Sequence, residues 1–170
     1  LTINSTALDQ FTFDNFRLTI PLDKLLPDKE NTITILFKGE YNHSGVGLHH
    51  YTDPTDQKEY LYTQFEPYDC NRLFPCFDQP DLKAVLDLTV IAPDEWIVLS
   101  NENEIENLKS KATTEDNITS VYNKALSQKE LDVVFNAHDI KNKEYTIHKF
   151  NPTPRISTYL YALCAGRYIC

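Results

Sequence analysis

The sequence predicts an all-β fold, a β-sandwich built mainly from antiparallel strands. Short segments in which apolar and polar residues alternate recur along the chain, which is typical of strands with one buried face. Turn-forming residues end these segments, and the 170 residues include only 4 glycines and 9 prolines to serve at the joints. A third observation is an apolar stretch of strand length near the end of the chain. Many short strands separated by turns favour a sandwich over an α/β fold.

The first expected strand covers residues 32–38. Its apolar residues Ile33, Ile35 and Phe37 alternate with polar or charged neighbours. Successive side chains of a strand point to opposite faces, so this alternation predicts one buried and one solvated face.

Two further strands are expected around Pro93. Residues 83–92 place four apolar side chains on one face, and Pro93-Asp94 is a turn signal that ends the segment. These four are Ala84, Leu86, Leu88 and Val90. Residues 96–99 then return as another short strand.

The last third of the chain contains a polar segment and two apolar ones. Residues 102–117 are rich in Asn, Glu, Lys and Thr and are interpreted as a solvated excursion between strands. Residues 131–135 alternate again, with apolar Leu131, Val133 and Phe135. Residues 159–165 are apolar on both faces, as in a central strand covered on both sides, although a buried helical segment has the same pattern.

Charge and hydropathy exclude several classes of partner. The chain has 25 acidic and 16 basic residues and a net charge of -9, and its scattered basic residues argue against a nucleic-acid surface. Its apolar stretches are far shorter than the roughly 18 residues of a membrane-spanning helix, so no transmembrane segment and no signal peptide are expected. The chain contains no methionine, which indicates a piece of a longer protein. We expect a cytoplasmic protein, although three Asn-x-Ser/Thr triplets would permit glycosylation of a secreted one.

Cysteine and histidine spacing gives no metal site. The pairs Cys70/Cys76 and Cys164/Cys170 do not have the short spacing of structural zinc sites and are interpreted as reduced, mostly buried thiols. His49 and His50 are adjacent, so in a strand they point to opposite faces and would not bind one metal. The chain also lacks a Ser-His-Asp arrangement and a phosphate-binding glycine loop, so no catalytic residue is expected in it.

One strand carries a pair of candidate ligand-binding residues. If residues 60–66 form a strand, Gln64 and Glu66 lie on the same face, at the end where Pro67 stops the ladder. This pair either faces a ligand or lies on a solvated sheet face. The irregular segment that follows, residues 69–84, is interpreted as structural, with its backbone polar groups satisfied by Asp78, Arg72 and Lys83.

Several of these stretches together resemble the N-terminal domain of M1 zinc aminopeptidases. The resemblance covers about residues 31–170 in order and rests on Gly47-Leu48-His49, Tyr62-Thr63-Gln64-Phe65-Glu66-Pro67, Arg72, Phe74-Pro75-Cys76-Phe77-Asp78-Gln79-Pro80, Lys83-Ala84, Thr153-Pro154-Arg155-Ile156-Ser157-Thr158-Tyr159-Leu160 and Ala165-Gly166.

The resemblance implies a single saddle-like β-sandwich domain over residues 1–170 that lacks its first strands and packs on a thermolysin-like catalytic domain. It implies that Glu66 binds the free α-amino group of a peptide substrate and that Gln64 lines the same pocket. The implied cofactor is zinc, held by a His-Glu-x-x-His helix in the catalytic domain. That motif does not occur in these 170 residues, so the chain alone is expected to be inactive and to bind no metal.

A noncatalytic module that binds protein or carbohydrate is the alternative function. The tyrosines Tyr60 and Tyr62 could stack on a sugar, although aromatic residues on strands more often serve packing. A full-length protein without the zinc motif would favour this alternative.

Overall fold

The structure is a computed structural model that describes residues 1–9, 11–109 and 144–168. The chain divides into two compact units, Leu1–Lys38 and Gly39–Cys170. The helices among the described residues are single 3-10 turns, and the other elements are strands, which confirms the all-β prediction. These turns are η1 (Leu22–Lys24), η2 (Cys70–Arg72) and η5 (Thr158–Leu160). None of the described helices is long and apolar enough to span a membrane.

The first unit consists of very short strands. Its sheet has the order β2-β1-β5, and a separate hairpin pairs β3 with β4. The bounds are β1 (Thr2–Ile3), β2 (Thr6–Ala7), β3 (Thr12–Phe13), β4 (Leu18–Thr19) and β5 (Ile33–Thr34). The expected strand over residues 32–38 is therefore wrong beyond Thr34, and Phe37 is 50% exposed. The ladder between β1 and β5 joins Thr2 to Thr34 and Ile3 to Ile33.

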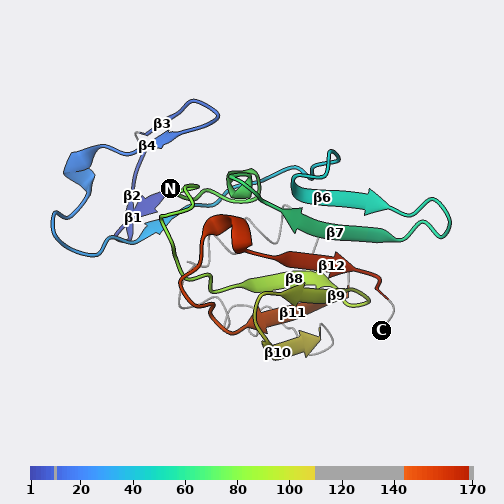
Figure 1. Cartoon of the computed structure of the whole chain (residues 1–170). Helices are drawn as coiled ribbons and strands as arrows, with labels where there is room; N and C mark the ends of the chain where they lie inside the picture. The colour runs from blue at the N-terminus through green and yellow to red at the C-terminus, as the bar shows by residue number, and fades with distance from the viewer. Residues whose placement is uncertain (10, 110–143, 169–170) are drawn as a thin grey trace. The chain divides into compact units, whose positions relative to one another are not determined.

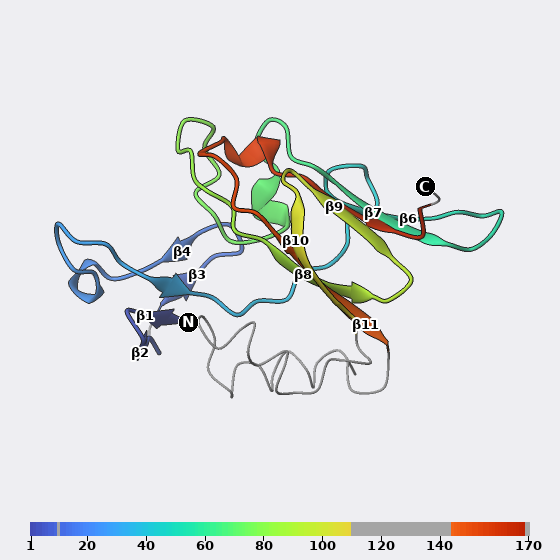
Figure 2. The same ribbon diagram turned by 90° about the horizontal axis from the view of Figure 1, so that it is seen from below.

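The second unit contains two antiparallel sheets, which can be followed in Figure 1 and from below in Figure 2. The four-stranded sheet has the order β6-β7-β12-β9, and the three-stranded sheet has the order β10-β11-β8. The bounds in the first sheet are β6 (Gly47–Thr52), β7 (Glu59–Gln64), β12 (Leu163–Gly166) and β9 (Ile97–Ser100). Those in the second are β10 (Glu104–Lys109), β11 (Tyr145–Phe150) and β8 (Thr89–Pro93).

Apolar side chains from both sheets form one core. Leu61, Val98 and Ala165 come from the four-stranded sheet, and Ala92 and Phe150 come from the three-stranded sheet; all five are buried in one cluster. Burial of one large apolar side chain stabilises a fold by about 1.5–3 kcal/mol. The two sheets therefore pack face to face, which confirms the sandwich.

A second buried cluster lies where β7 ends. Phe65, Cys70 and Tyr161 are buried together there, and Phe74 and Leu86 pack against them. This cluster supports the irregular segment that follows β7, so it fixes the surroundings of the candidate residues Gln64 and Glu66.

The strand predicted over residues 83–92 is confirmed in its second half. Strand β8 begins at Thr89, but the backbone before it still bonds to the end of β11 and the segment that follows. Phe150 N donates to Leu88 O at 3.1 Å, and Thr153 N donates to Leu86 O at 3.0 Å. Leu86, Leu88 and Val90 are half-buried as predicted, whereas Ala84 is exposed. The strand expected at residues 96–99 is β9, displaced by one residue.

The apolar segment 159–165 forms a strand only from Leu163. Strand β12 lies between β7 and β9, so the prediction of a central strand is confirmed there. Its first part is the 3-10 turn η5, in which Leu160 N donates to Ser157 O at 3.0 Å. Side-chain bonds of Ser157 and Thr158 hold this turn in place, a local effect that apolar periodicity does not reveal.

The interpretation of residues 102–117 as a solvated excursion is wrong for Glu104–Lys109, which is strand β10. Among the described strands, β10 pairs with β11 alone and lies at an edge of its sheet. Edge strands commonly carry charged residues, which prevent pairing with another chain, so a polar sequence is compatible with a strand here. Residues 110–117 and the alternating segment 131–135 lie outside the described residues.

Candidate functional site

Strand β7 places the two candidate residues at one end of the four-stranded sheet. Along β7 the side chains alternate: Leu61 is buried and Tyr62 is 39% exposed. Gln64 is the last residue of the strand and is exposed on the side of Tyr62, while Phe65 turns into the second buried cluster. Glu66 follows the strand and is also exposed, next to a cis peptide bond with Pro67.

The side chains of Gln64 and Glu66 have no intramolecular partner among the described residues. An exposed carboxylate and carboxamide without partners remain hydrated and are free to bind a ligand. The predicted strand over 60–66 therefore holds to Gln64, and the arrangement at its end agrees with either a ligand-facing pair or a solvated face.

The backbone after Glu66 is fixed by hydrogen bonds to one carboxylate. Asp78 Oδ2 accepts from Asn71 N at 2.9 Å and from Asn71 Nδ2 at 2.7 Å, and Asp78 Oδ1 accepts from Thr158 Oγ1 at 2.7 Å. Ser157 Oγ also donates to Pro80 O at 2.5 Å. Asp78 thus links η2, its own loop and η5, although these parts are far apart in the sequence.

The prediction that side chains satisfy the backbone of residues 69–84 is confirmed for Asp78, whereas Arg72 bonds to a side chain. Arg72 Nε donates to Asp69 Oδ1 at 2.5 Å within this segment. The expectation for the Lys83 side chain is wrong, because its ammonium group has no partner among the described residues. The backbone carbonyl oxygen of Lys83 accepts a hydrogen bond from Arg155 Nη2 at 3.1 Å.

A glycine allows β6 to lie against η2 beside the site. Gly47 pairs with Gln64 across the β6–β7 ladder and has a φ of 71°. A Cβ atom on Gly47 would lie 2.9 Å from Cβ of Arg72, an atom that cannot move without the backbone of η2. Glycine is therefore required for conformation and for close approach.

We expect Gly47→Ala to lower the free energy of unfolding by about 2 kcal/mol, because the new methyl group adds a clash to the cost of a positive φ. Gly45→Ala is the matched control: Gly45 has a φ of 89°, but no atom lies within 4 Å of a Cβ built on it. We expect the control to cost about 1 kcal/mol, the conformational term alone. Urea unfolding measures both, and equal losses would show that contact with Arg72 is unimportant.

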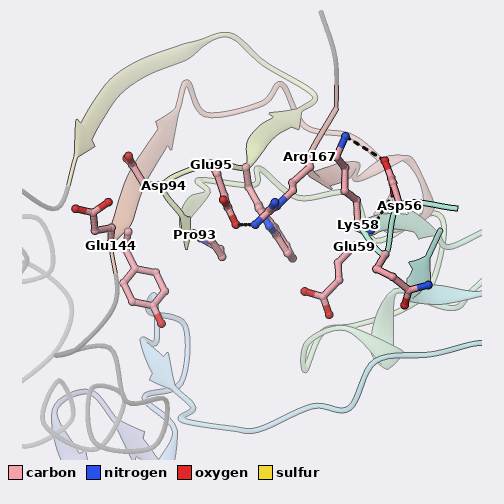
Figure 3. A pocket seen from close by; sticks show the side chains of 11 residues that line it. Asp56, Lys58, Glu59, Pro93, Asp94, Glu95, Glu144 and Arg167 are labelled. Carbon is pink, nitrogen blue, oxygen red and sulfur yellow. Dashed lines mark hydrogen bonds and ion pairs between the residues drawn. The ribbon is translucent and has the colours of Figure 1, made fainter. Parts of the chain in front are cut away.

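A separate hollow lies at the other end of β7 and does not include Gln64 or Glu66. Its volume is about 570 Å³, and ion pairs between Lys58 and Asp56 and between Arg167 and Glu95 lie among its lining side chains (Figure 3). Its lining residues are Asp56, Gln57, Lys58, Glu59, Pro93, Asp94, Glu95, Trp96, Glu144, Tyr145 and Arg167. Glu59 and Gln64 are the two ends of β7, about 17 Å apart at 3.3 Å per residue. The hollow and the candidate pair are therefore different places.

Sequence reasoning missed a buried histidine, His148, that bonds to a glutamate on the neighbouring strand. His148 on β11 is 4% exposed, and its Nδ1 lies 2.6 Å from Glu104 Oε1 on β10. Its Nε2 is buried without a partner among the described residues. Burying Nε2 without a proton costs less free energy than burying it as an unpaired N–H group. The ring proton is therefore assigned to Nδ1, which donates it to Glu104. The two residues are far apart in sequence, and nothing local marks them as a pair.

The described residues offer no group of three His, Cys, Asp or Glu side chains that could hold a metal ion. His49 and His50 point to opposite faces, as predicted. The His49 ring contacts that of Tyr62, with centroids 4.8 Å apart, while the His50 ring stacks on Tyr41 at 5.3 Å.

Comparison with known proteins identifies the family. Residues 2–128 match the Peptidase M1 N-terminal domain family. The chain is 36% identical over 169 residues to Aminopeptidase N of Streptomyces lividans, an alignment that covers 99% of this chain and 15% of that protein. It is 33% identical over 153 residues to Aminopeptidase M1-A of Oryza sativa subsp. japonica, covering 89% of this chain and 14% of that protein.

These relatives are much longer than the chain, which spans about 15% of the length of Aminopeptidase N from Streptomyces lividans. The region matched by the family model includes the strand that ends at Gln64 and the segment fixed by Asp78. The chain therefore belongs to the Peptidase M1 N-terminal domain family.

Proposed function

We propose that this chain is the substrate-anchoring domain of a zinc aminopeptidase, in which Glu66 binds the α-ammonium group of the peptide and Gln64 lines the same pocket. The observation that carries the proposal is the exposed, unpartnered carboxylate at the end of β7, in a chain whose relatives are aminopeptidases.

The chemistry of an ammonium ligand fits such a carboxylate. A peptide amine that enters a closed site loses its water, and a carboxylate that faces it replaces those lost hydrogen bonds. A charge-assisted hydrogen bond of this kind contributes about 1.5–3 kcal/mol. Because only the first residue of a peptide has a free amine, the contact would restrict cleavage to the N-terminal residue.

Gln64 offers a neutral partner beside the charged one. Its carboxamide has one acceptor oxygen and two N–H donors, so it can bond to the amine or to the first carbonyl group without adding charge. Its backbone is fixed by the ladder to Gly47, so its side chain starts from a defined position.

A face for the rest of the protein lies beside this pair. Phe77 is 78% exposed and Tyr68 is 64% exposed in the segment held by Asp78, and Leu160 in η5 is 48% exposed. Large apolar side chains gathered on one segment mark an interaction surface. We propose that the catalytic domain covers them and closes the pocket over Glu66.

The described residues offer no site for the zinc of such an enzyme. The described residues supply no three-ligand group, so the metal would be held by the part of the protein outside these 170 residues. The contribution of this domain to the reaction is therefore to bind and orient the substrate.

The test is hydrolysis of aminoacyl-anilides by the full-length protein, with and without a zinc chelator, beside the same substrates acetylated at the amine. We expect cleavage of the free amines, loss of activity on chelation, and recovery when zinc is returned. We also expect no cleavage of acetylated substrates. If no substrate is cleaved, the noncatalytic module becomes the better interpretation, although Tyr60 and Tyr62 already pack against Tyr168 and His49.

A further inference from the structure

Two cysteines next to the candidate site lie together in the second buried cluster. Cys70 is the first residue of η2 and is 0% exposed, and Cys76 packs half-buried against the same cluster. Both side chains belong to this one cluster, and each thiol shifts the pKa of the other. Both are free thiols in the structure.

The backbone between the two cysteines turns back on itself and is held in that form. Leu73 N donates to Cys70 O at 2.9 Å at the start of the turn. Asn71 N and Nδ2 both donate to Asp78 Oδ2, so a residue beside Cys70 is tied to a residue beside Cys76. These bonds hold Cys70 and Cys76 in one turn beside the same cluster through contacts that do not involve the thiols.

We propose that Cys70 and Cys76 form a reversible disulfide on exposure to a small-molecule disulfide such as oxidised glutathione. The pair is a modification site that adjoins the substrate anchor and does not depend on the proposed enzymatic function. No other cysteine is needed, because the partner of each thiol is already in place.

The two thiols have different chemical roles. Interaction with Cys70 lowers the pKa of Cys76, whereas interaction with Cys76, together with burial and the nearby Asp78, raises the pKa of Cys70. Cys76 is also the more exposed of the two. The thiolate is the attacking species in disulfide exchange, so Cys76 reacts first.

The reaction balances in two exchange steps. The Cys76 thiolate attacks one sulfur of oxidised glutathione, which gives a mixed disulfide and releases one glutathione thiolate. Cys70 then attacks the Cys76 sulfur, passes its proton to the second departing glutathione, and closes the intramolecular bond. The protein loses two electrons and two protons, and oxidised glutathione is reduced to two molecules of glutathione.

Peptide mapping of the full-length protein tests the proposal, because trypsin cuts between the two cysteines. Cleavage after Lys58, Arg72 and Lys83 separates residues 59–72, which contain Cys70, from residues 73–83, which contain Cys76. After treatment with oxidised glutathione, blocking of remaining thiols and digestion, we expect these two peptides to stay linked. Dithiothreitol added before digestion should separate them again.

Two variants test which cysteines form the link, and a third is the control. Cys76→Ser alters the half-buried partner and should abolish the linked peptide, and Cys70→Ala should do the same at the buried position. Cys164→Ala removes a half-buried thiol on β12 and should leave the linked peptide unchanged. Circular dichroism identifies any variant that does not fold, and either Cys76→Ser or Cys70→Ala alone is sufficient for the comparison.

A second readout follows from closure of the loop. Oxidation should raise the urea midpoint of the wild-type protein and of Cys164→Ala, because the cross-link restricts the unfolded chain, and should leave that of Cys76→Ser unchanged. The proposal is overturned if Cys76 stops at the mixed disulfide with glutathione, or if Cys70 is found linked to another cysteine.

Discussion

Replacement of Asp78 by alanine is expected to lower the free energy of unfolding by about 3 kcal/mol, the largest effect predicted for any single side chain discussed above. The carboxylate accepts three hydrogen bonds, from two groups of Asn71 and from the hydroxyl of Thr158. Thr158 is 3% exposed, so its hydroxyl would be left without a partner and without water. Loss of a charged acceptor and burial of an unpaired donor both destabilise the fold.

Urea unfolding of the full-length protein measures this loss, with Asp81→Ala as the control. Asp81 lies three residues away, is exposed, and has no side-chain partner among the described residues. Its replacement should change stability by less than about 0.5 kcal/mol. Equal effects of the two substitutions would mean that the bonds to Asp78 do not hold the segment together.

Replacement of Glu66 by glutamine is expected to lower kcat/KM of the full-length protein for aminoacyl-anilides by about 30-fold, or roughly 2 kcal/mol. Glutamine keeps the size of the side chain and removes its charge, so the change reports on the charge-assisted bond to the substrate amine. The fold should be unaffected, because the Glu66 side chain has no partner among the described residues.

Glu59→Gln is the matched control for this change. Glu59 lies at the start of β7, is also exposed, and lines the separate hollow at the far end of the strand. Among the described residues its carboxylate bonds to the ring of His50, at 3.2 Å, so the substitution should leave kcat/KM unchanged. An undiminished kcat/KM in Glu66→Gln would remove Glu66 from the substrate site.

Alternation in the sequence predicted strands well where a strand has a buried face. Residues 60–64 and 96–99 were predicted well because their apolar side chains enter a shared core. Alternation of apolar and polar residues reports this burial of one strand face. Strand β10 was missed because an edge strand can be polar on both faces. Residues 35–38 were predicted wrongly because their alternation is not accompanied by burial, since Phe37 is half exposed.

The candidate site was predictable only in part, because local patterns do not contain contacts between residues far apart in the sequence. The position of Gln64 on an exposed face follows from the period of two along a single strand, and the irregular segment after Pro67 follows from its composition. The bond between Asp78 and Thr158 joins residues 80 positions apart, and no local pattern contains it. The division of the chain at Lys38 likewise depends on contacts that appear only after folding, and the prediction of a single domain over residues 1–170 stays a prediction.

The central claim, that Glu66 contacts the α-amine of the substrate, is tested most directly with two inhibitors that differ only in that amine. An aminoacyl hydroxamate and its desamino analogue would be titrated against the wild-type full-length protein and the Glu66→Gln variant, which forms a double-mutant cycle between one side chain and one ligand group. We predict that the wild-type protein binds the amine-containing inhibitor about 30-fold more tightly than its analogue, a difference of roughly 2 kcal/mol, and that Glu66→Gln loses most of this preference. The same preference in both proteins would contradict the claim.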